Sequence, residues 1–594
     1  MADGSQATRY TTKPPRLQTQ REKNIVEESL QEFKQMVNWR NVFAAQWNEV
    51  AELILPDSRN TFQYMNFNWP GEKKTQRQID ATGMLALEKF SAIMDSLLTP
   101  KNMRWHILTA SDPQLMKNRS VRLWFEQVTN ILFQLRYAGM SGFAGQNNNN
   151  YLQIGAFGTM GMFIDELDQF SYPATKGIRY KSIPMGELFI RENHQGIVDG
   201  FTRWFKYDAR QAYQKWGPMG TFPVELQTAL DAKSPMPHDF IHRVVPRTDY
   251  DPERLDGRQF PYASYYISIK GEVLLQEGGY RMMPAAIGRW KQAPNEVYGR
   301  SPAMSVLPSL KTLNAQKATF LKQGHRIVDP VLLTADDGIV DVSLRPGALN
   351  KGGVTADGKE LIKVLPTGNI QTSIEMMAEE KNLIEESFLV ALFKIALQAE
   401  NLPQMTATQI IEMVNQKGIL IAPTVGRQEG EYLSVMIERE IDVASYLGLL
   451  PPMPPLLREA KGQYKVESTS PLARMAKAQE AAGGLRTLEV AKEMAAVTQD
   501  MSVFDVFDLD VMLPAIADIQ GMPESWRADD AAMQRKRQAR AQAQARQEQI
   551  QAMPAMAAMK KADAVQAKAG IGPMPPPGQL PAGGGPPLQE QVAR

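Results

Sequence analysis

The chain has 594 residues, of which 43% are hydrophobic and 22% charged, a balance that indicates two to four packed domains and excludes a membrane protein. Its 66 Lys and Arg nearly match its 65 Asp and Glu, so any contact with nucleic acid must be local. The absence of cysteine excludes disulfides, thiolate metal sites and a cysteine nucleophile. With no apolar signal near the start and no run of 18 apolar residues, we expect a protein made and kept in the cytoplasm, or in something assembled there.

Three amphipathic helices are predicted in the first part of the chain. Apolar residues recur three, four or seven positions apart over residues 26–54 before Pro56, over 87–97 before Pro100, and over 121–132. Eight of the nine Trp precede residue 291, so the core of large side chains is N-terminal. We expect the three helices to pack together in that core.

An antiparallel sheet is expected to follow. Short extended runs occupy residues 162–165, 187–191, 198–205, 240–245, 262–269 and 273–276, and turn-forming residues such as Lys270-Gly271 separate them. The first 290 residues therefore predict an α+β fold.

Two long helices joined by a small β insertion come next. One helix is predicted over residues 302–327, restarted at Pro308, and short strands at 331–334 and 361–365. Thr372 with Glu375 predicts a capping box for the second helix. That helix is expected to bury Met377, Ile384, Phe388, Leu392 and Ile395. The result is a helical hairpin with a compact tip.

The remainder of the chain is predicted to be mainly helical. Thr406 and Gln409 predict another capping box after the loop 399–405, and helices are expected to continue through 427–447. Residues 531–570 carry eight Lys or Arg against two acids and predict a basic helix interrupted at Pro554. Twelve of the last 24 residues are Gly or Pro, so that tail is expected to be disordered.

Catalytic and ligand-binding patterns are weak. His238 and His242 have zinc-like spacing, but an extended strand is predicted there, so we place them on a sheet surface. Gly353 to Lys359 imitates a phosphate loop, yet Glu360 replaces its hydroxyl residue, which favours a surface turn. The triplet Gly155, Gly158 and Gly161 indicates close backbone packing. We expect a structural protein without cofactor, metal or enzymatic activity; the alternatives are a DNA-processing enzyme or motor subunit, and a coiled-coil scaffold.

Several short motifs, in their order and spacing over residues 39–452, resemble the portal, or head-to-tail connector, proteins of short-tailed bacteriophages. They are Trp47-x-Glu49 with Pro56, Asp80-x-Thr82-Gly83, Leu98-Thr99-Pro100 with Trp105, Gly158-Thr159, Gly196-x-Val198-Asp199 with Arg203, Tyr298-Gly299-Arg300-Ser301-Pro302, Leu313-Asn314 and Thr406-Ala407-Thr408. The family usually has Glu where this chain has Gln409, and Gln serves the same cap.

The resemblance implies a mainly helical portal fold with an antiparallel sheet. Its segments would be a flexible start (1–22), an α+β wing (23–297), a first stem helix (298–327), a small β clip (328–370), a second stem helix (371–398), a tunnel loop (399–405), helices joining wing and crown (406–455), crown or barrel helices (456–570) and a disordered tail (571–594). It further implies a homo-oligomeric ring, typically a dodecamer, at one capsid vertex of the virion and assembled in the host cytoplasm. The implied partners are double-stranded DNA, the terminase large subunit, a tail adaptor, and the major capsid and scaffolding proteins, with no membrane.

Candidate site residues follow from this assignment and from charge. The tunnel loop would present Asn401, Leu402, Pro403 and Gln404 to DNA, and the first stem helix carries Lys311, Lys317, Lys322 and Arg326 without an acid. Lys311, Lys322 and Arg326 share one helical face, and either pair with the acidic second stem helix or line the bore. A solvated helix face is the other interpretation. The clip offers Lys351, Lys359 and Lys363 for docking, and the crown offers Arg535, Lys536, Arg537, Arg540 and Arg546 to DNA.

Overall fold

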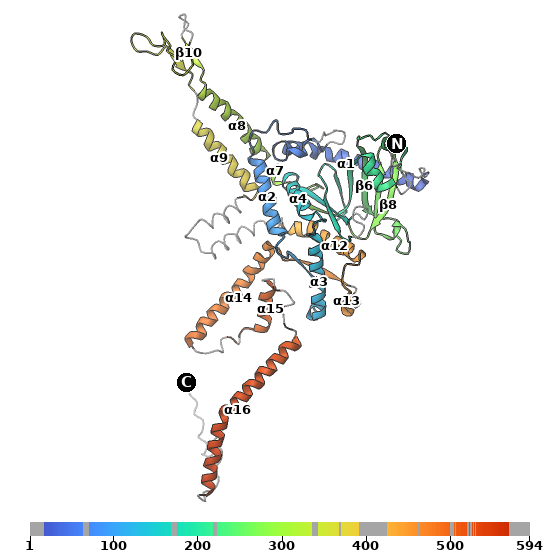
Figure 1. The fold of residues 1–594 in the computed structure, drawn as a ribbon, viewed down its shortest axis with the longest axis vertical. Helices are drawn as coiled ribbons and strands as arrows, with labels where there is room; N and C mark the ends of the chain where they lie inside the picture. The colour runs from blue at the N-terminus through green and yellow to red at the C-terminus, as the bar shows by residue number, and fades with distance from the viewer. Residues whose placement is uncertain are drawn as a thin grey trace, which may run out of the picture. The chain divides into compact units, whose positions relative to one another are not determined.

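The computed structural model describes residues 17–62, 71–167, 175–217, 222–334, 342–366, 370–390, 425–460, 462–498, 504, 506–519, 522, 526, 528 and 530–568. The chain forms two compact units, Met1–Met522 and Pro523–Arg594. Figure 1 shows the helices and strands of each unit.

Four helices build the first part of the core. They are α1 (Gln20–Leu53), α2 (Thr82–Leu98), α3 (Arg119–Arg136) and α4 (Phe143–Phe157), with one-turn helices at Pro56–Ser58 and Leu115–Lys117. The three predicted helices are confirmed and share one apolar core. Helix α1 starts at Gln20, earlier than the predicted Val26, because Thr19 and Glu22 form a capping box there. Helix α4, which packs on α2, was not predicted: its run of Asn residues conceals the apolar stripe.

Two antiparallel sheets lie beside these helices, where one was predicted. The first has the order β3-β2-β9, formed by β2 (Thr159–Glu166), β3 (Ile178–Ser182) and β9 (Ala285–Arg289). The second runs β4-β5-β6-β7-β8, formed by β4 (Leu188–Glu192), β5 (Val198–Tyr207), β6 (His238–Pro246), β7 (Tyr262–Ser268) and β8 (Val273–Tyr280). The predicted strands are confirmed, and the missed β3 and β9 are only five residues long.

Helix α1 covers one face of the five-stranded sheet. Phe33 meets Phe189 edge to face, 5.0 Å between ring centres, and Arg243 pairs with Glu28 at 2.9 Å and also with Glu32. The opposite face packs against the first sheet and against α5 (Ala209–Trp216) and α6 (Val224–Asp231). Both faces are therefore buried, and the sheet forms the middle layer of the wing.

His242 points toward that second face, so its predicted place on the sheet surface is wrong. Its side chain is buried and stacks on Tyr266 with ring centres 3.9 Å apart, and its Nε2 lies 2.9 Å from the Ser264 hydroxyl. The five-stranded sheet is covered on both faces, which alternation in one strand cannot reveal.

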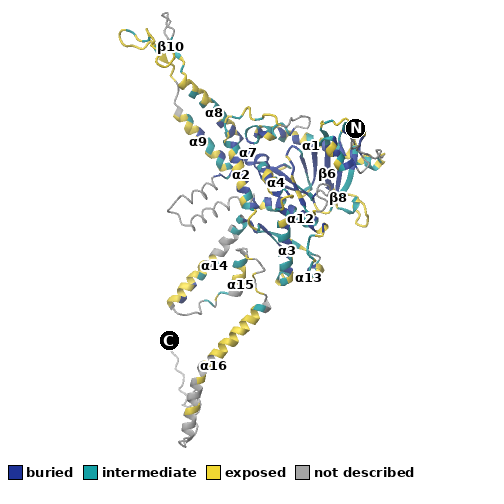
Figure 2. Cartoon of the chain, in the orientation of Figure 1, coloured by how far each residue is buried: buried dark blue, intermediate teal, exposed yellow. Residues whose placement is uncertain are grey.

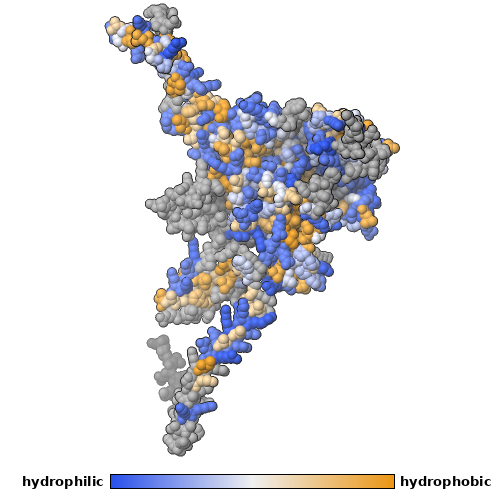
Figure 3. Space-filling view, viewed as in Figure 1, coloured by the Kyte–Doolittle hydropathy of each residue, from blue (hydrophilic) through white to orange (hydrophobic). Residues whose placement is uncertain are grey.

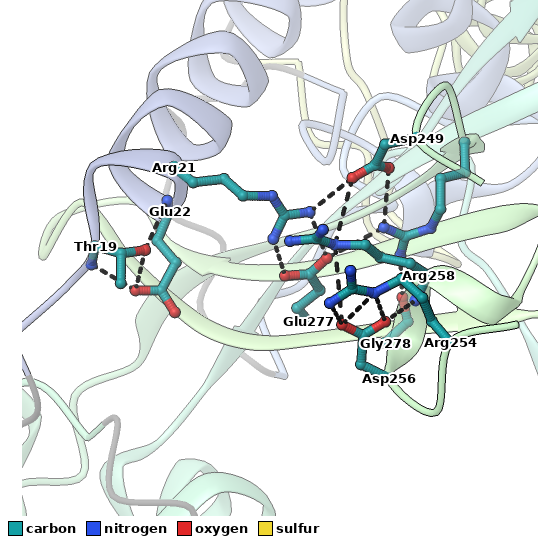
Figure 4. A network of polar contacts seen from close by, with 10 residues as sticks. Thr19, Arg21, Glu22, Asp249, Arg254, Asp256, Arg258, Glu277 and Gly278 are labelled. Carbon is teal, nitrogen blue, oxygen red and sulfur yellow. Dashed lines mark hydrogen bonds and ion pairs between the residues drawn. The ribbon is translucent and has the colours of Figure 1, made fainter. Parts of the chain in front are cut away.

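The start of α1 is fixed to the sheet edge by ion pairs (Figure 4). Arg21 donates to Glu277 on β8 at 2.8 Å and to Asp249 at 3.1 Å. Buried Arg247 joins the same two carboxylates, at 3.1 and 3.3 Å. These contacts order the loop between β6 and β7, which includes a single turn at Gly257–Gln259, so the predicted flexible start gives way to ordered backbone before residue 23.

A helical hairpin extends from this core. Short α7 (Pro302–Ser305) is followed by α8 (Leu307–Val328), which confirms the predicted restart near Pro308. Strands β10 (Leu332–Thr334) and β11 (Ile362–Val364) pair antiparallel at the tip, and α9 (Ile370–Ser387) returns alongside α8. Thr372 lies inside α9, so the capping box predicted there is wrong: the helix already includes Ile370.

The chain then returns to the wing. A π-helical segment (Glu429–Ser434) continues into α12 (Val435–Tyr446), followed by α13 (Pro455–Glu459). Strand β12 (Tyr464–Ser468) pairs antiparallel with β1 (His106–Ala110), so the predicted start of crown helices at residue 456 is too early. This pairing joins segments more than 350 residues apart, as Thr109 and Lys465 illustrate, and no local pattern marks it. Helices α14 (Pro471–Thr498) and α15 (Leu509–Ile519) follow.

The second unit contains one long helix, α16 (Asp530–Lys568). Its backbone stays helical through Pro554, so the predicted interruption there is wrong. The Gly/Pro tail over residues 571–594 lies outside the described residues.

Candidate assembly and DNA-channel elements

The hairpin of α8 and α9, hereafter the stem, is rooted in the wing at one end. Leu310 packs so closely on α2 that a Cβ added to Gly83 would lie 2.7 Å from its Cδ2 atom. The Asn314 side-chain oxygen accepts hydrogen bonds from the backbone N–H groups of Ile79 at 2.8 Å and Asp80 at 3.2 Å. Phe388, directly after α9, meets Phe90 edge to face. These contacts fix where the stem leaves the wing.

Beyond this root the stem is barely buried (Figure 2). Helix α8 has three buried residues, Leu307, Leu310 and Leu313, all in its first two turns. Apolar side chains farther along are exposed, and Figure 3 shows hydrophobic surface on the stem. They include Leu321 (44%), Ile327 (44%), Ile374 (43%), Met376 (51%) and Leu383 (48%). Met377 and Ile384 on α9, and Phe388 directly after it, are buried as predicted, whereas Leu392 and Ile395 lie outside the described residues.

The stem cations do not pair with α9 of the same chain in the part that the structure describes. Lys311 reaches Glu49 on α1 at 2.6 Å, which corrects the expectation that the second stem helix is its partner. Lys317 lies 5.5 Å from the ring of Phe320. Lys322 and Arg326 are exposed, and no described carboxylate is within ion-pair distance of either. Their charges thus face solvent or another molecule.

The tip carries the three predicted docking lysines. Lys351, Lys359 and Lys363 are all exposed. Residues 355–359 form a tight turn in which the Lys359 N–H donates to the Thr355 hydroxyl at 3.1 Å, and Val354 bridges to Glu360. The phosphate-loop imitation is therefore a surface turn, as predicted.

The predicted tunnel loop, Asn401, Leu402, Pro403 and Gln404, lies outside the described residues, as do the end of the second stem helix over 391–398 and the capping box at Thr406. In the second unit, Arg535, Lys536, Arg537, Arg540 and Arg546 are all exposed along α16. Positive charge is therefore concentrated on the first half of that helix, over residues 535–546.

A buried ion pair holds α3 to α12 and was missed by sequence reasoning. Arg136 Nε lies 2.9 Å from Glu440 Oε1, and neither side chain is exposed. The Tyr180 hydroxyl donates to the same carboxylate at 2.6 Å, and Arg136 sits 4.4 Å above the Trp105 ring. Burial raises the pKa of Tyr180, so the phenol stays protonated as a donor. The group is structural, because it is sealed from solvent and no substrate could reach it.

A pocket of about 400 Å³, hereafter the wing pocket, is lined by the starts of β5 and β7, by strand β9, by the π-helical segment Glu429–Ser434 and by α12. Arg289 forms its base: the guanidinium bonds to Glu431 at 2.9 Å, to Glu192, and to the Gly196 carbonyl at 3.1 Å. Its apolar lining includes Ile197, Met282 and Met283. Glu438 in this lining forms no ion pair or hydrogen bond with another described residue, and burial raises its pKa.

Sites for other chemistry are not found in the described ranges. No group of three or more His, Asp or Glu there could hold a metal ion. His242 is packed on an aromatic ring, so the His pair is not a metal site. No described helix combines the length and hydropathy that crossing a bilayer requires.

Close backbone packing explains the glycine triplet. Gly158 has φ of 78°, and an added Cβ would lie 2.3 Å from the carbonyl oxygen of Gly299. The Thr159 hydroxyl accepts from the Gly299 N–H at 2.9 Å. The two motifs Gly158-Thr159 and Tyr298-Gly299 therefore meet where the sheet passes into the stem.

Two phage proteins are similar to this chain over most of its length. The probable portal protein of Bordetella phage BPP-1 is 27% identical over 515 residues, covering 83% of this chain and 87% of that protein. The portal protein of Salmonella phage epsilon15 is 24% identical over 503 residues, covering 84% and 87%. The solved structure of a native gene transfer agent virion is 10% identical, covers 68% of this chain and 84% of its own, and has a TM-score of 0.29. The neck of an empty gene transfer agent particle is 12% identical, covers 68% of this chain and 85% of its own, and has a TM-score of 0.30. Both TM-scores are too low to support an argument.

The family model described as "Bacteriophage head to tail connecting protein" matches residues 26–527, which include nearly all of the wing and the whole stem. The resemblance seen in the short motifs is thereby confirmed, and the chain belongs to the bacteriophage head to tail connecting proteins.

Proposed function

We propose that this protein assembles as a closed ring, typically of twelve copies, at one capsid vertex, and that double-stranded DNA passes through its axis during packaging and ejection. The observation that carries the proposal is the stem, whose apolar side chains beyond the root remain exposed in one chain. Contiguous exposed apolar surface marks an interaction site. Copies related by rotation would cover it, because each stem then lies between two neighbours.

Charge supports the same arrangement. Over residues 302–327 the first stem helix has four cations and no acid, while over 371–398 the second has five acids and two Lys. Because Lys322 and Arg326 have no described carboxylate partner in their own chain, we propose that the acidic helix of a neighbour provides it. Each exposed pair contributes roughly 0 to 1 kcal/mol, so the pairs set register more than affinity.

The strength of electrostatic binding argues against unpaired cations in the bore. If about twelve cations each neutralised one phosphate, the logarithm of the DNA-binding constant would change with the logarithm of the salt concentration by a slope of roughly −11. Binding of that strength would prevent the DNA from moving through the bore. We therefore propose that the uncharged segment Asn401 to Gln404 makes the weak contacts with moving DNA. Lys311, already paired with Glu49, contributes no free charge to the bore.

The exposed tip suits a docking platform. Lys351, Lys359 and Lys363 all face solvent on the tip, and we propose that the terminase large subunit and then a tail adaptor bind there in turn. On α16 we propose that Arg535, Lys536, Arg537, Arg540 and Arg546 contact packaged DNA inside the capsid, formed with major capsid and scaffolding proteins. Truncation at residue 530 should leave assembly unchanged and reduce DNA retention; loss of assembly would instead indicate helix packing.

Leu383→Lys tests ring formation. A charge on the exposed stem surface should reduce the mass of the assembled particle in light scattering and abolish hollow rings in negative-stain images. Folding should change by less than about 0.5 kcal/mol, because Leu383 is half exposed. The matched control is Leu255→Lys on the wing loop, where the native side chain is 97% exposed. A purified wild-type protein that remains a monomer without a central opening would overturn the proposal.

A second experiment tests the seam pairs. Lys322→Glu combined with Arg326→Glu should weaken assembly by placing acids opposite acids. If assembly is unchanged and only DNA passage or retention alters, these side chains line the bore and the pairing is wrong.

A further inference from the structure

One side of α1 exposes two large apolar side chains among uncharged residues. Trp39 is 75% exposed and Val42 is 79% exposed. The exposed positions around them, Gln35, Asn38, Asn41 and Ala45, carry no charge, and the intervening Arg40 is buried. The exposed charged residues Lys34 and Glu49 lie at the two ends of this stretch. Tryptophan is the residue most enriched where binding energy concentrates, so this face, hereafter the Trp39 face, has the composition of an interface centre.

The wing pocket lies on the opposite side of the five-stranded sheet. Phe33, on the inner side of α1, packs against the sheet face that includes Phe189 and Ile241. Tyr262, which lines the pocket, belongs to the other face, since it pairs with Pro246 in register with His242 and Tyr266. The Trp39 face and the pocket therefore cannot meet within one chain.

The Trp39 face and the wing pocket are chemically complementary. The pocket offers apolar walls at Ile197 and Met282, 59% and 38% exposed, so both remain available for contact. Glu431 pairs with Arg289, but Glu438 forms no ion pair or hydrogen bond with another described residue. An indole has one N–H donor, which needs an acceptor when buried, and an unpaired carboxylate is such an acceptor.

We infer that Trp39 and Val42 of one copy dock in the wing pocket of the next copy, with the Trp39 Nε1–H donating to Glu438. The inference rests on the proposed ring. Rotational rings need a heterologous interface, in which two different patches on separate sides of each chain are complementary, and these two patches meet that requirement. The contact joins the wings and is separate from the stem surface.

Cysteine cross-linking tests it directly, because the chain contains no cysteine of its own. Val42→Cys with Ile197→Cys, oxidised as the assembled full chain, should give a ladder of covalent oligomers on a non-reducing gel. The matched pair Val42→Cys with Leu255→Cys, also at exposed positions, should give none. An assembled protein without a Val42–Ile197 ladder overturns the docking inference and leaves the ring intact. A wild-type chain that does not assemble overturns both.

Assembly affinity provides a second readout. Trp39→Ala should raise the concentration needed for assembly roughly tenfold or more, as for a central interface aromatic. Leu255→Ala, which removes an equally exposed apolar side chain, should not. Trp39→Phe and Glu438→Met should each weaken assembly, and the double variant no more than the stronger single one, because both remove the same hydrogen bond. Fully additive effects would exclude that bond.

Discussion

The wing and the stem of this protein are stabilised in different ways. The wing surrounds its largest side chains completely: Trp47, Trp105, Trp216 and Arg136 are all less than 2% exposed. In the stem, burial is largely confined to the root, and the side chains of Leu321 and Met376 are about half exposed. Burial of apolar surface is the main stabilising contribution to folding. A single chain provides this burial fully for the wing and only in part for the stem. A substitution in the wing should thus act on folding, and one in the stem on assembly.

The largest effect is expected at the buried ion pair of the wing. Glu440→Ala leaves Arg136 charged and without its partner in a sealed interior, and should cost ~3–5 kcal/mol in the free energy of unfolding. Urea unfolding followed by near-ultraviolet circular dichroism measures it. The double variant Arg136→Met with Glu440→Leu should recover much of the loss, because it removes both charges. A loss below about 1 kcal/mol for Glu440→Ala would contradict the wing's dependence on this pair.

Acid should destabilise the wing through two buried histidines. Burial lowers the pKa of His106 and of His242 well below the ordinary 6.5. The unfolded chain therefore binds protons near pH 6.5 that the folded chain excludes, and stability falls as the pH drops below that value, by at most roughly 1.4 kcal/mol per pH unit for each histidine.

Urea midpoints at pH 7.5, 6.5 and 5.5 measure this slope. His242→Phe should reduce it, whereas His194→Gln, at an exposed turn, should not. A slope that His242→Phe leaves intact would show that other groups cause it.

The same substitution should have opposite signs in the two regions. In wing helix α4, a Cβ at Gly155 would lie 2.6 Å from Leu87 and 2.8 Å from Phe90, so Gly155→Ala should cost about 1–3 kcal/mol by overpacking. In stem helix α8, nothing lies within 4 Å of a Cβ at Gly324, and Gly324→Ala should stabilise that helix by about 0.5–1 kcal/mol. Amide hydrogen exchange in α4 and α8 separates the two effects; equal signs would contradict the contrast in packing.

The smallest effect is expected where stem and wing meet at the surface. Lys311→Met removes the pair with Glu49, in which both side chains are about half exposed, and should cost no more than about 1 kcal/mol. The matched variant Lys322→Met, whose lysine has no described carboxylate partner, should cost less. Thermal unfolding at low and high salt compares them, since salt should remove any difference.

Several elements were predictable because their signals are local. The apolar spacing of α1 to α3, the restart before Pro308 and the turn at residues 355–359 each depend on neighbours within a few positions. The capping box was predicted at Thr372, inside α9, because a cap pattern occurs by chance and no tertiary contact was known to exclude it. The interruption predicted at Pro554 was wrong for a similar reason: proline disfavours a helix but does not exclude one, and the helix is continuous there.

The sites show the same division. Exposure of the tip lysines follows from a polar turn. For Lys311 the sequence left the acidic second stem helix, the bore and solvent open, and its partner Glu49 lies on α1, 262 positions away in the chain. The wing pocket unites residues 196–198, 282–289 and 430–438, whose identities taken singly are ordinary. Exposure of Trp39 contradicts the rule that large aromatic residues are buried, and only a folded chain can reveal such an exception.

The sequence alone determined the helical and extended segments, the two-helix hairpin with its tip, the opposite charges of its helices and the motifs of the family. Each of these features depends on residues that are close together in the chain or on the order of the motifs along it. The tertiary structure decided the double-layered sheets, the return of β12 to β1, the burial of His242 and Arg136, and the separation of the Trp39 face from the wing pocket. Those features depend on which distant surfaces exclude water from each other. Burial is a property of the packed whole, and no local pattern encodes it.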